Sequence, residues 1–279
     1  MITEHLQFDL FGKKAFEKAV VCPPFRFTAV LEDEACFYFT IHGTVDMYSP
    51  KGKVTNHENE GVVMRCGTYL NGFLATEDME YCEVIAVHFY PNILRSIYDK
   101  DLLARIGEVA DVKPIQYKKY PNTVLLKNYI ESLQFYFENP ALVSEELLKL
   151  KMKELILLLA KTDNLRAIKA LFASLFNPLE IDLRAVIEAN LYHNVSVEEL
   201  AALCKMSLSS FKRSFTKQYG TSPARYLRER KLEKAAQLLK NTNLRISDIA
   251  FDTGFTDLAH FSKTFQKKFG FSPTNFRLN

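Results

Sequence analysis

The sequence is short of the features that mark exported and membrane proteins. Its longest apolar run, residues 155–160, is far below the roughly 20 residues that a helix needs to cross a bilayer. The first ten residues include Glu4 and Asp9 and contain no apolar stretch of the kind found in export signals. The five cysteines are odd in number and form no Cys-x-x-Cys pair, which favours reduced thiols over a disulfide framework. These absences predict a cytoplasmic protein that does not enter a membrane.

The charge of the chain is distributed unevenly. With 48% hydrophobic residues and only ten glycines and ten prolines, 279 residues are enough for one or two folded domains. Residues 205–277 contain 15 Lys/Arg and 5 Asp/Glu, a net charge of +10, whereas residues 1–204 contain 21 and 28, a net charge of −7. A basic C-terminal region suggests a polyanion as its partner, although charge alone is equally compatible with a solvated basic surface.

A repeat with an offset of 50 residues lies near the C-terminus. It aligns residues 211–215 (FKRSF) with 261–265 (FSKTF), 219–223 (YGTSP) with 269–273 (FGFSP), and Tyr226 with Phe276. Upstream the offset falls to 49, which pairs residues 200–201 with 249–250 and places one inserted residue in the second turn. The copies span about 30 residues each, too few for a solenoid, so they indicate a duplicated supersecondary unit.

The first copy predicts a helix, a tight turn and a second helix. Ser196 and Glu199 have the spacing of a capping box, in which each side chain binds a free amide of the first helical turn. Residues 204–206 form the turn, and Ser207 is the expected N-cap of a second helix that continues to Lys217.

The second copy predicts the same arrangement with different capping residues. Ser247 is expected to begin its first helix, and Gly254 to end that helix in a left-handed conformation. Thr256 or Asp257 then caps a second helix that continues to Lys267. Both copies close with Gly-x-Ser-Pro, in which the proline suits the first position of a following helix.

In both copies an aromatic pair fixes the orientation of the second helix. Phe211 with Phe215, and Phe261 with Phe265, are spaced four residues apart and must face inward. The remaining positions carry short polar and basic side chains, as expected of a helix that enters a major groove of DNA. The predicted DNA-binding residues are Ser207, Ser209, Lys212, Arg213, Thr216, Lys217, Thr256, Leu258, Ala259, Ser262, Lys263, Gln266 and Lys267. One copy alone would fit an ordinary amphipathic helix, but two copies favour DNA binding.

Residues 223–240 predict one continuous helix between the copies, with Leu227, Leu232, Ala235 and Leu239 as its buried stripe. At about 1.5 Å per residue this helix is about 26 Å long. Such a length suits two second helices that meet successive major-groove segments, which lie about 34 Å apart.

Four segments, residues 246–250 (ISDIA), 254–255 (GF), 261–265 (FSKTF) and 268–273 (KFGFSP), resemble the signature of the AraC/XylS family of bacterial transcription regulators. The resemblance covers roughly residues 180–279. It implies a seven-helix domain with two helix-turn-helix units joined by a central helix. It also implies a regulator, usually an activator, that works with RNA polymerase at a promoter.

By motif position, the base-contacting positions of this family fall on Ser209, Lys212 and Arg213 in the first unit. In the second unit they fall on Leu258, Ala259, Ser262 and Lys263. The apolar residues Leu258 and Ala259 depart from the polar side chains often found there. The second unit is therefore expected to make methyl or phosphate contacts more than hydrogen bonds to bases.

The N-terminal half predicts an antiparallel β-barrel followed by helices. Short strands are expected across residues 25–90, within a barrel of about residues 1–90, with turns at 49–52, 56–59 and 71–72. A helix starts at Pro91, and longer helices are expected at 122–138 and 144–161. This layout resembles the cupin-like regulatory domain of the same family.

The predicted fold class is therefore α+β, with a cupin-like barrel and helical hairpin before an all-α domain. The expected divisions are a regulatory and dimerisation domain (1–161), a linker (162–179) and a DNA-binding domain (180–279). The DNA-binding domain is divided into residues 196–217, 223–240 and 246–267, which are the first unit, the linker helix and the second unit.

Two binding roles are open for the N-terminal domain. A pocket lined by Phe25, Phe27, Phe37 and Phe39 would hold a small effector, unless these rings simply pack together as a core. Alternatively, residues 122–160 bind a protein partner or a second copy of the chain, because residues 147–159 are apolar on more than one face. A core between domains would explain that pattern as well, and a domain that only oligomerises is the simplest alternative.

A metal-dependent cupin enzyme fused to a DNA-binding module is the enzymatic alternative. Its candidate ligands are His42, His57 and His88, but they form no His-x-His pair and no glutamate stands at a suitable spacing. Nor do the cysteines supply a zinc site for a methyl-accepting protein, because the four candidates fit core positions better. Those four are Cys22, Cys36, Cys66 and Cys82. We therefore expect no catalytic residue, no metal and no cofactor.

Overall fold

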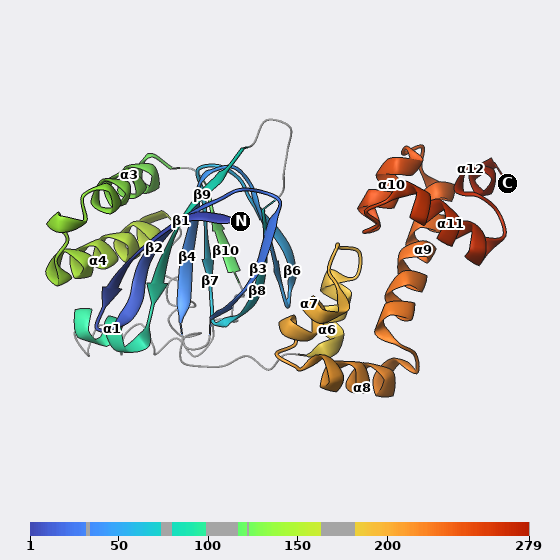
Figure 1. Cartoon of the computed structure of the whole chain (residues 1–279), viewed down its shortest axis with the longest axis horizontal. Coiled ribbons are helices and arrows are strands. Elements are labelled where there is room, and N and C mark those ends of the chain that lie inside the picture. The colour runs from blue at the N-terminus through green and yellow to red at the C-terminus, as the bar shows by residue number, and fades with distance from the viewer. Residues whose placement is uncertain (32–33, 74–79, 99–116, 122, 163–181, 279) are drawn as a thin grey trace. The chain divides into compact units, whose positions relative to one another are not determined.

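The computed structural model describes residues 1–31, 34–73, 80–98, 117–121, 123–162 and 182–278 (Figure 1). The chain divides into two compact units, one that contains the strands and the helices up to α4, and one formed mainly by the helices from α6 onward. The linker predicted at 162–179 lies outside the described residues, apart from its first residue. No described helix is long and apolar enough to cross a membrane.

The strands of the first unit form two sheets. A six-stranded antiparallel sheet has the order β1-β2-β9-β4-β7-β10, and a four-stranded sheet has the order β3-β8-β5-β6. Their strands are β1 (Ile2–Leu10), β2 (Lys13–Val21), β3 (Phe25–Leu31), β4 (Ala35–His42), β5 (Val45–Ser49), β6 (Gly52–Asn56), β7 (Glu60–Met64), β8 (Gly67–Phe73), β9 (Cys82–Phe89) and β10 (Tyr117–Tyr120).

Helices cover one face of the six-stranded sheet, and the four-stranded sheet covers the other. The helical elements are α1 (Pro91–Ile97), α3 (Val124–Glu138), the 3-10 turn η1 (Pro140–Leu142) and α4 (Glu145–Thr162). Thr123 caps α3 by accepting a hydrogen bond from the amide of Leu126. These bounds confirm the helices predicted from Pro91, over 122–138 and over 144–161.

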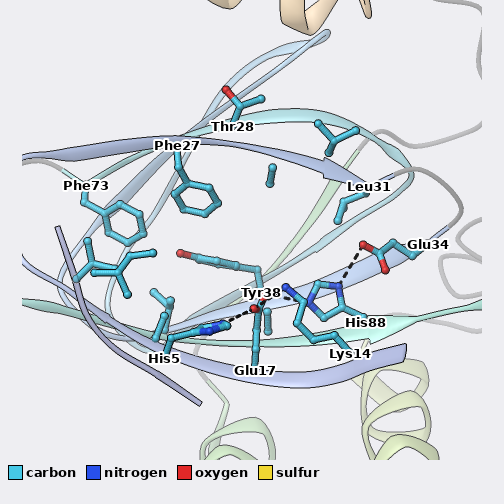
Figure 2. A pocket seen from close by; sticks show the side chains of 17 residues that line it. His5, Lys14, Glu17, Phe27, Thr28, Leu31, Glu34, Tyr38, Phe73 and His88 are labelled. Carbon is cyan, nitrogen blue, oxygen red and sulfur yellow. Dashed lines mark hydrogen bonds and ion pairs between the residues drawn. The ribbon is translucent and has the colours of Figure 1, made fainter. Parts of the chain in front are cut away.

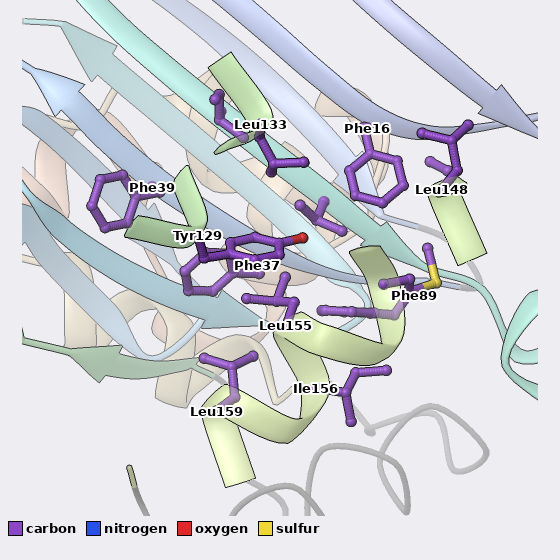
Figure 3. Close-up of a cluster of buried hydrophobic side chains, with 14 of the residues drawn as sticks. Phe16, Phe37, Phe39, Phe89, Tyr129, Leu133, Leu148, Leu155, Ile156 and Leu159 are labelled. Carbon is purple, nitrogen blue, oxygen red and sulfur yellow. The ribbon is translucent and has the colours of Figure 1, made fainter. Parts of the chain in front are cut away.

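The alternation of β4 divides its side chains between two cores. Phe37 and Phe39 face α3 and α4, where they join a buried cluster that includes Tyr129 and Leu155 (Figure 3). Cys36 and Tyr38 point to the opposite side, into the core between the two sheets. Successive side chains of a strand point to opposite faces, so one strand serves both cores.

The α+β class is confirmed, but three details of the prediction were wrong. The strands form two sheets instead of a closed barrel. The turn expected at residues 71–72 is instead part of β8, where Asn71 pairs with Phe27 on one side and Met47 on the other. The pairing on both sides keeps this Asn-Gly sequence extended. Individual strands were not predicted before residue 25, although Leu6, Phe8 and Leu10 alternate with polar residues along β1.

The second unit is helical. Its elements are α6 (Leu183–Asn190), α7 (Val197–Leu203), α8 (Leu208–Tyr219), α9 (Pro223–Asn241), α10 (Ile246–Asp252), α11 (Leu258–Phe269) and α12 (Pro273–Leu278). Helix α9 confirms the predicted linker helix, and all four residues of its predicted stripe, Leu227, Leu232, Ala235 and Leu239, are buried. Pro223 and Pro273 are the first residues of α9 and α12, as predicted.

Candidate nucleic-acid interface

Side-chain caps begin the two helices of the first helix-turn-helix unit. The hydroxyl of Ser196 accepts a hydrogen bond from the amide of Glu199 (3.1 Å), and the Glu199 carboxylate accepts one from the amide of Ser196 (2.7 Å). This reciprocal pair is the predicted capping box. Ser207 caps α8 by accepting from the amide of Ser210, also as predicted.

The helices of the second helix-turn-helix unit are capped differently. Asp257 caps α11 by accepting from the amide of Ala259 (2.8 Å), which decides between the two predicted candidates. The prediction that Ser247 begins α10 was wrong, because Arg245 is the N-cap residue and Ser247 already lies in the first turn. The helix starts at Ile246, whose side chain packs against the core of this unit.

Both turns use a residue in the left-handed region, at equivalent positions of the repeat. Lys205 has φ of 53° in the first turn, and Gly254 has φ of 80° in the second. The residue after each donates to the equivalent carbonyl: Met206 to Ala201, and Phe255 to Ala250, both at 2.9 Å. The two turns therefore have the same hydrogen-bonding pattern although their residue types differ.

An aromatic cluster holds each second helix in place, and the cluster is duplicated with the repeat. In the first helix-turn-helix unit the rings of Phe215 and Tyr219 stack 4.4 Å apart, and Tyr226 from α9 packs against both. In the second helix-turn-helix unit the equivalent rings of Phe265, Phe269 and Phe276 make the same three contacts. The predicted inward pairs, Phe211 with Phe215 and Phe261 with Phe265, are fully buried.

We call α8 and α11 the recognition helices. Each extends two residues beyond the predicted end and stops at a glycine in the left-handed region, Gly220 or Gly270. The structure leaves twelve of the thirteen predicted DNA-binding residues exposed, and only Ser262 is half-buried. Ser207 and Ser209 are linked through their hydroxyls at 3.2 Å, so the cap of α8 also orients one predicted base-contacting side chain.

The predicted basic residues of the recognition helices form no ion pair with the described part of the chain. These residues are Lys212, Arg213, Lys217, Lys263 and Lys267. By contrast, Arg225 on α9 is paired with Glu229 at 2.8 Å. Exposed cations without an internal partner are suited to phosphate oxygens of a nucleic acid.

A cavity of about 350 Å³ lies between the sheets of the first unit (Figure 2). One part of its wall is apolar and contains Phe27 and Phe73, and the buried ring of Tyr38 also faces the cavity. The hydroxyl of Tyr38 is buried and has no hydrogen-bond partner among the described residues. A buried hydroxyl without a partner costs free energy, so this group is a natural contact for a ligand.

The other part of the cavity wall is a row of charged side chains. His88 Nε2 lies 2.9 Å from Glu17 Oε1, and His88 Nδ1 lies 3.4 Å from Glu34. Glu17 also accepts from Lys14 at 2.7 Å and contacts His5 at 2.9 Å. Burial alone would lower the pKa of His88, but its two carboxylate partners outweigh that effect and raise it. Burial likewise opposes ionisation of Glu17, yet His88 and the other cations hold its pKa well below the usual range.

The four phenylalanines predicted to line an effector pocket separate into two groups. Phe27 lines the cavity, and Phe25 packs 6.1 Å from Phe27 in the core between the sheets. Phe37 and Phe39 do not line it, because β4 directs them to the helices. The sequence shows which residues of β4 alternate, but it does not show which of its two apolar faces borders a cavity.

Two of the three histidines considered as metal ligands, His42 and His88, form ion pairs with glutamates in the structure. His42 pairs with Glu58 at 2.9 Å, and His88 lies in the charged row of the cavity. Across the described ranges, no group of three or more His, Cys, Asp or Glu side chains has the arrangement of a metal site.

Two family models match the chain, each falling mainly within one of the two compact units. One is described as a helix-turn-helix domain and matches residues 200–279; the other, the ExsA N-terminal regulatory domain, matches residues 35–171. The chain belongs to the AraC/XylS family of transcription regulators. It is thus a DNA-binding regulator with an N-terminal regulatory domain.

Within the AraC/XylS family, the chain is similar to regulators of Yersinia and Pseudomonas, among others. The thermoregulatory protein LcrF of Yersinia pestis is 26% identical over 255 residues, which are 90% of this chain and 92% of LcrF. The virulence regulon transcriptional activator VirF of Yersinia enterocolitica is 30% identical over 164 residues, 57% of this chain and 60% of VirF. The regulator ExsA of Pseudomonas aeruginosa is 29% identical over 128 residues, 46% of each chain.

Several site residues were missed by reasoning from the sequence. Tyr38, Glu17 and Glu34 were not considered as pocket residues, although Tyr38 alternates with Phe37 and Phe39 along β4. The left-handed conformation of Lys205 carried no signal, because lysine is not a residue that usually adopts it. Helix α6 was not predicted as a separate element, although Asp182 is its N-cap.

Proposed function

We propose that the two recognition helices enter successive major-groove segments on one face of a promoter duplex, about one helical turn (~34 Å) apart. The observation that carries this proposal is the duplicated aromatic cluster, which gives α8 and α11 the same orientation within their units. A single chain would then recognise two blocks of sequence.

The two helices carry different side chains and therefore recognise their blocks differently. Lys212 and Arg213 on α8 would contact base edges and phosphates. Leu258 and Ala259 on α11 are exposed but apolar, which fits contacts with thymine methyl groups. Ser262 and Lys263 would add polar or phosphate contacts beside them. Ser209 shares the base-contacting face of α8 with Lys212 and Arg213. The remaining exposed residues border these positions; they are Ser207, Thr216, Lys217, Thr256, Gln266 and Lys267.

Selection of bound duplexes from a random DNA pool by the full chain, at two salt concentrations, tests the proposal. We expect enrichment of a site with two blocks about one helical turn apart. Arg213→Ala should weaken binding by about 1–3 kcal/mol and relax the preference in one block only, whereas Lys263→Ala should act on the other. Lys234→Ala on α9 is the matched control, because it removes the same charge outside the recognition helices. Salt-sensitive binding without an enriched motif would contradict the proposal.

We further propose that the protein is an activator that recruits RNA polymerase to the promoter in the cytoplasm. Support comes from relatives whose names describe activation, such as VirF and the transcriptional activator RhaS of Klebsiella pneumoniae, which is 38% identical over 95 residues. Transcription in vitro from the selected site, with and without the chain, distinguishes activation from repression.

The cavity supports a second role, the sensing of a small effector. We propose that it holds a molecule with an apolar body and a hydroxyl head, because Phe27 and Phe73 are apolar and the Tyr38 hydroxyl has no partner among the described residues. The charged row has paired cations and carboxylates, which does not favour a ligand of one net charge. A graded series of alkyl and aromatic alcohols should raise the Tm of the wild type more than that of Tyr38→Phe. Equal shifts in both proteins would refute a role for the hydroxyl.

Residues 122–160 are proposed as the dimer contact. Leu150 and Leu157 on α4 are 61% and 60% exposed and lie seven residues apart, which places them on one face of the helix. In the described part of the chain both leucines face outward. A second copy would cover them.

A further inference from the structure

Lys231 on α9 joins the loop that precedes the first helix-turn-helix unit to the turn inside the second unit. Its ammonium donates to the carbonyl oxygen of His193 at 3.1 Å and to that of Gly254 at 3.2 Å. His193 lies in the loop between α6 and α7, which precedes the first recognition helix. Gly254 lies in the turn between α10 and α11, which precedes the second. One side chain thus contacts the backbone on both sides of α9.

The same two loops approach each other closely at Gly254. A Cβ atom on this residue would lie 2.8 Å from the carbonyl oxygen of Tyr192, 3.1 Å from that of His193 and 2.7 Å from Lys231 Nζ. Only a glycine lets the turn come this near, apart from the positive φ that it also needs. The carbonyl oxygens of Tyr192, His193 and Gly254 therefore lie near one another. Their partial negative charges repel unless a cation lies between them.

Lysine suits this position for chemical reasons. An ammonium has three donors and no acceptor, so it can bind carbonyl oxygens from different directions at the same time. Lys231 is half-buried, and burial lowers the pKa of its ammonium, which shows that the contact is partly removed from water. Hydrogen bonds made by charged groups are stronger than those between neutral groups, and more so away from water.

Other contacts attach each unit to its own part of α9. The first helix-turn-helix unit packs on Tyr226 near the start of α9, through Phe215 and Tyr219. The second unit is attached farther along, where Lys268 binds Glu233 at 3.0 Å, and Arg277 donates to the carbonyl of Leu244 just beyond the helix. With these contacts alone, the distance between the recognition helices would follow any bending of α9. A direct link between the units removes that freedom.

We infer that Lys231 is a positioning residue that fixes the α10–α11 turn against the α6–α7 loop and so sets the block spacing that the two recognition helices accept on DNA. This inference rests on the proposed recognition of two blocks. Lys231 need not touch DNA for this role. Its removal should change the tolerated spacing more than the sequence preference within either block.

The test compares the wild-type full chain with Lys231→Met, which keeps the apolar stem and removes the ammonium. Affinity is measured by fluorescence anisotropy on duplexes from the selection, with the blocks at the preferred spacing and at one base pair more or fewer. The wild type should lose at least tenfold in affinity when the spacing changes by one base pair. Lys231→Met should lose less than about threefold for the same change, with unchanged preference within each block.

Lys234→Met is the matched control, since it removes a lysine three residues further along the same helix; it should keep the wild-type spacing penalty. An unchanged penalty in Lys231→Met would overturn the inference. So would an affinity loss in Lys231→Met that is equal at every spacing, because that is the effect of a lost charge or a damaged fold.

A measurement without DNA keeps the inference testable if the selection gives no two-block site, a result that would count against the proposed function alone. Spin-labelled amino acids are introduced at positions 217 and 267, one on each recognition helix, and their distance distribution is measured by pulsed electron paramagnetic resonance. Lys231→Met should broaden this distribution relative to the wild type and Lys234→Met. An equally narrow distribution in all three proteins would show that Lys231 does not fix the two units.

Discussion

Phe276 packs edge-on against Phe265, with ring centroids 5.2 Å apart and an angle of 81° between the rings. Fifty residues earlier Tyr226 meets Phe215 in the same way, at 5.5 Å and 72°. Because a phenylalanine makes the same ring contact in the second copy, the hydroxyl of Tyr226 is not needed for this packing.

Tyr226→Phe should therefore change the free energy of unfolding by less than about 0.5 kcal/mol. Phe215→Ala should lower it by about 3–5 kcal/mol, because it empties a fully buried site at the centre of the cluster. Urea unfolding followed by circular dichroism measures both. A large loss in Tyr226→Phe would show that the two clusters are not energetically equivalent.

The two left-handed turn residues should respond in opposite ways to substitution. Lys205→Gly relieves a conformation that costs a side-chain-bearing residue about 1–2 kcal/mol, offset by roughly 0.5–1 kcal/mol of glycine entropy. We expect a gain of up to about 1 kcal/mol in the free energy of unfolding. Gly254→Ala should instead destabilise by more than about 1 kcal/mol, since its Cβ atom would collide with the carbonyl of Tyr192. Thermal unfolding of the two variants shows whether their shifts have these signs.

The charged row of the cavity should make stability depend on pH. The pKa of His88 is raised in the folded state, so its contribution is fully present below its unfolded pKa of about 6.5 and is lost as pH rises through the folded value. The pKa of Glu17 is lowered, so its contribution is present above about 4.3, its unfolded pKa, and is lost as pH falls through the folded value. The groups that face them are Lys14, His5, Glu34 and Tyr90.

His88→Gln should lower the free energy of unfolding by about 1–3 kcal/mol at pH 6, where the wild type carries a protonated His88 bound to carboxylates. At pH 9 the difference between the two proteins should be smaller. Urea titrations at both pH values give the comparison. A difference that is the same at pH 6 and pH 9 would mean that protonated His88 has no special stability in the fold.

The exposed leucines of α4 allow a test of the proposed dimer. Leu150→Glu combined with Leu157→Glu places charges on the face that a second copy would cover, and should convert a dimer to a monomer. Leu244→Glu is the control, because that leucine is also exposed (42%) but lies in the second unit. Sedimentation equilibrium gives the masses. If the double variant sediments as the wild type does, the contact lies elsewhere.

The second unit could be predicted closely because its signals are local. The capping box at Ser196, the inward pair Phe261 and Phe265 and the helix-starting Pro223 each determine structure within a few residues. The error at Ser247 has the same origin: a serine near a helix start is a strong local signal, but the packing of Ile246 determined where α10 begins.

The first unit could be predicted only in outline because its structure depends on pairing between distant strands. The extended state of Asn71 comes from neighbours on two other strands, which the local Asn-Gly sequence does not reveal. The faces of Phe37 and Tyr38 depend on which side of the sheet receives α3 and α4. Lys231 was missed for a similar reason, since its partner His193 lies 38 residues away in the sequence.

Strand β4 connects the cavity of the first unit with the helix pair α3 and α4. Phe37 and Phe39 pack against the helix pair, and Tyr38, the residue between them, borders the cavity. A ligand that shifts the backbone at Tyr38 would also shift its neighbours Phe37 and Phe39 on the same strand. Strand β4 thus offers a direct structural route by which a ligand in the cavity would alter the packing of α3 and α4.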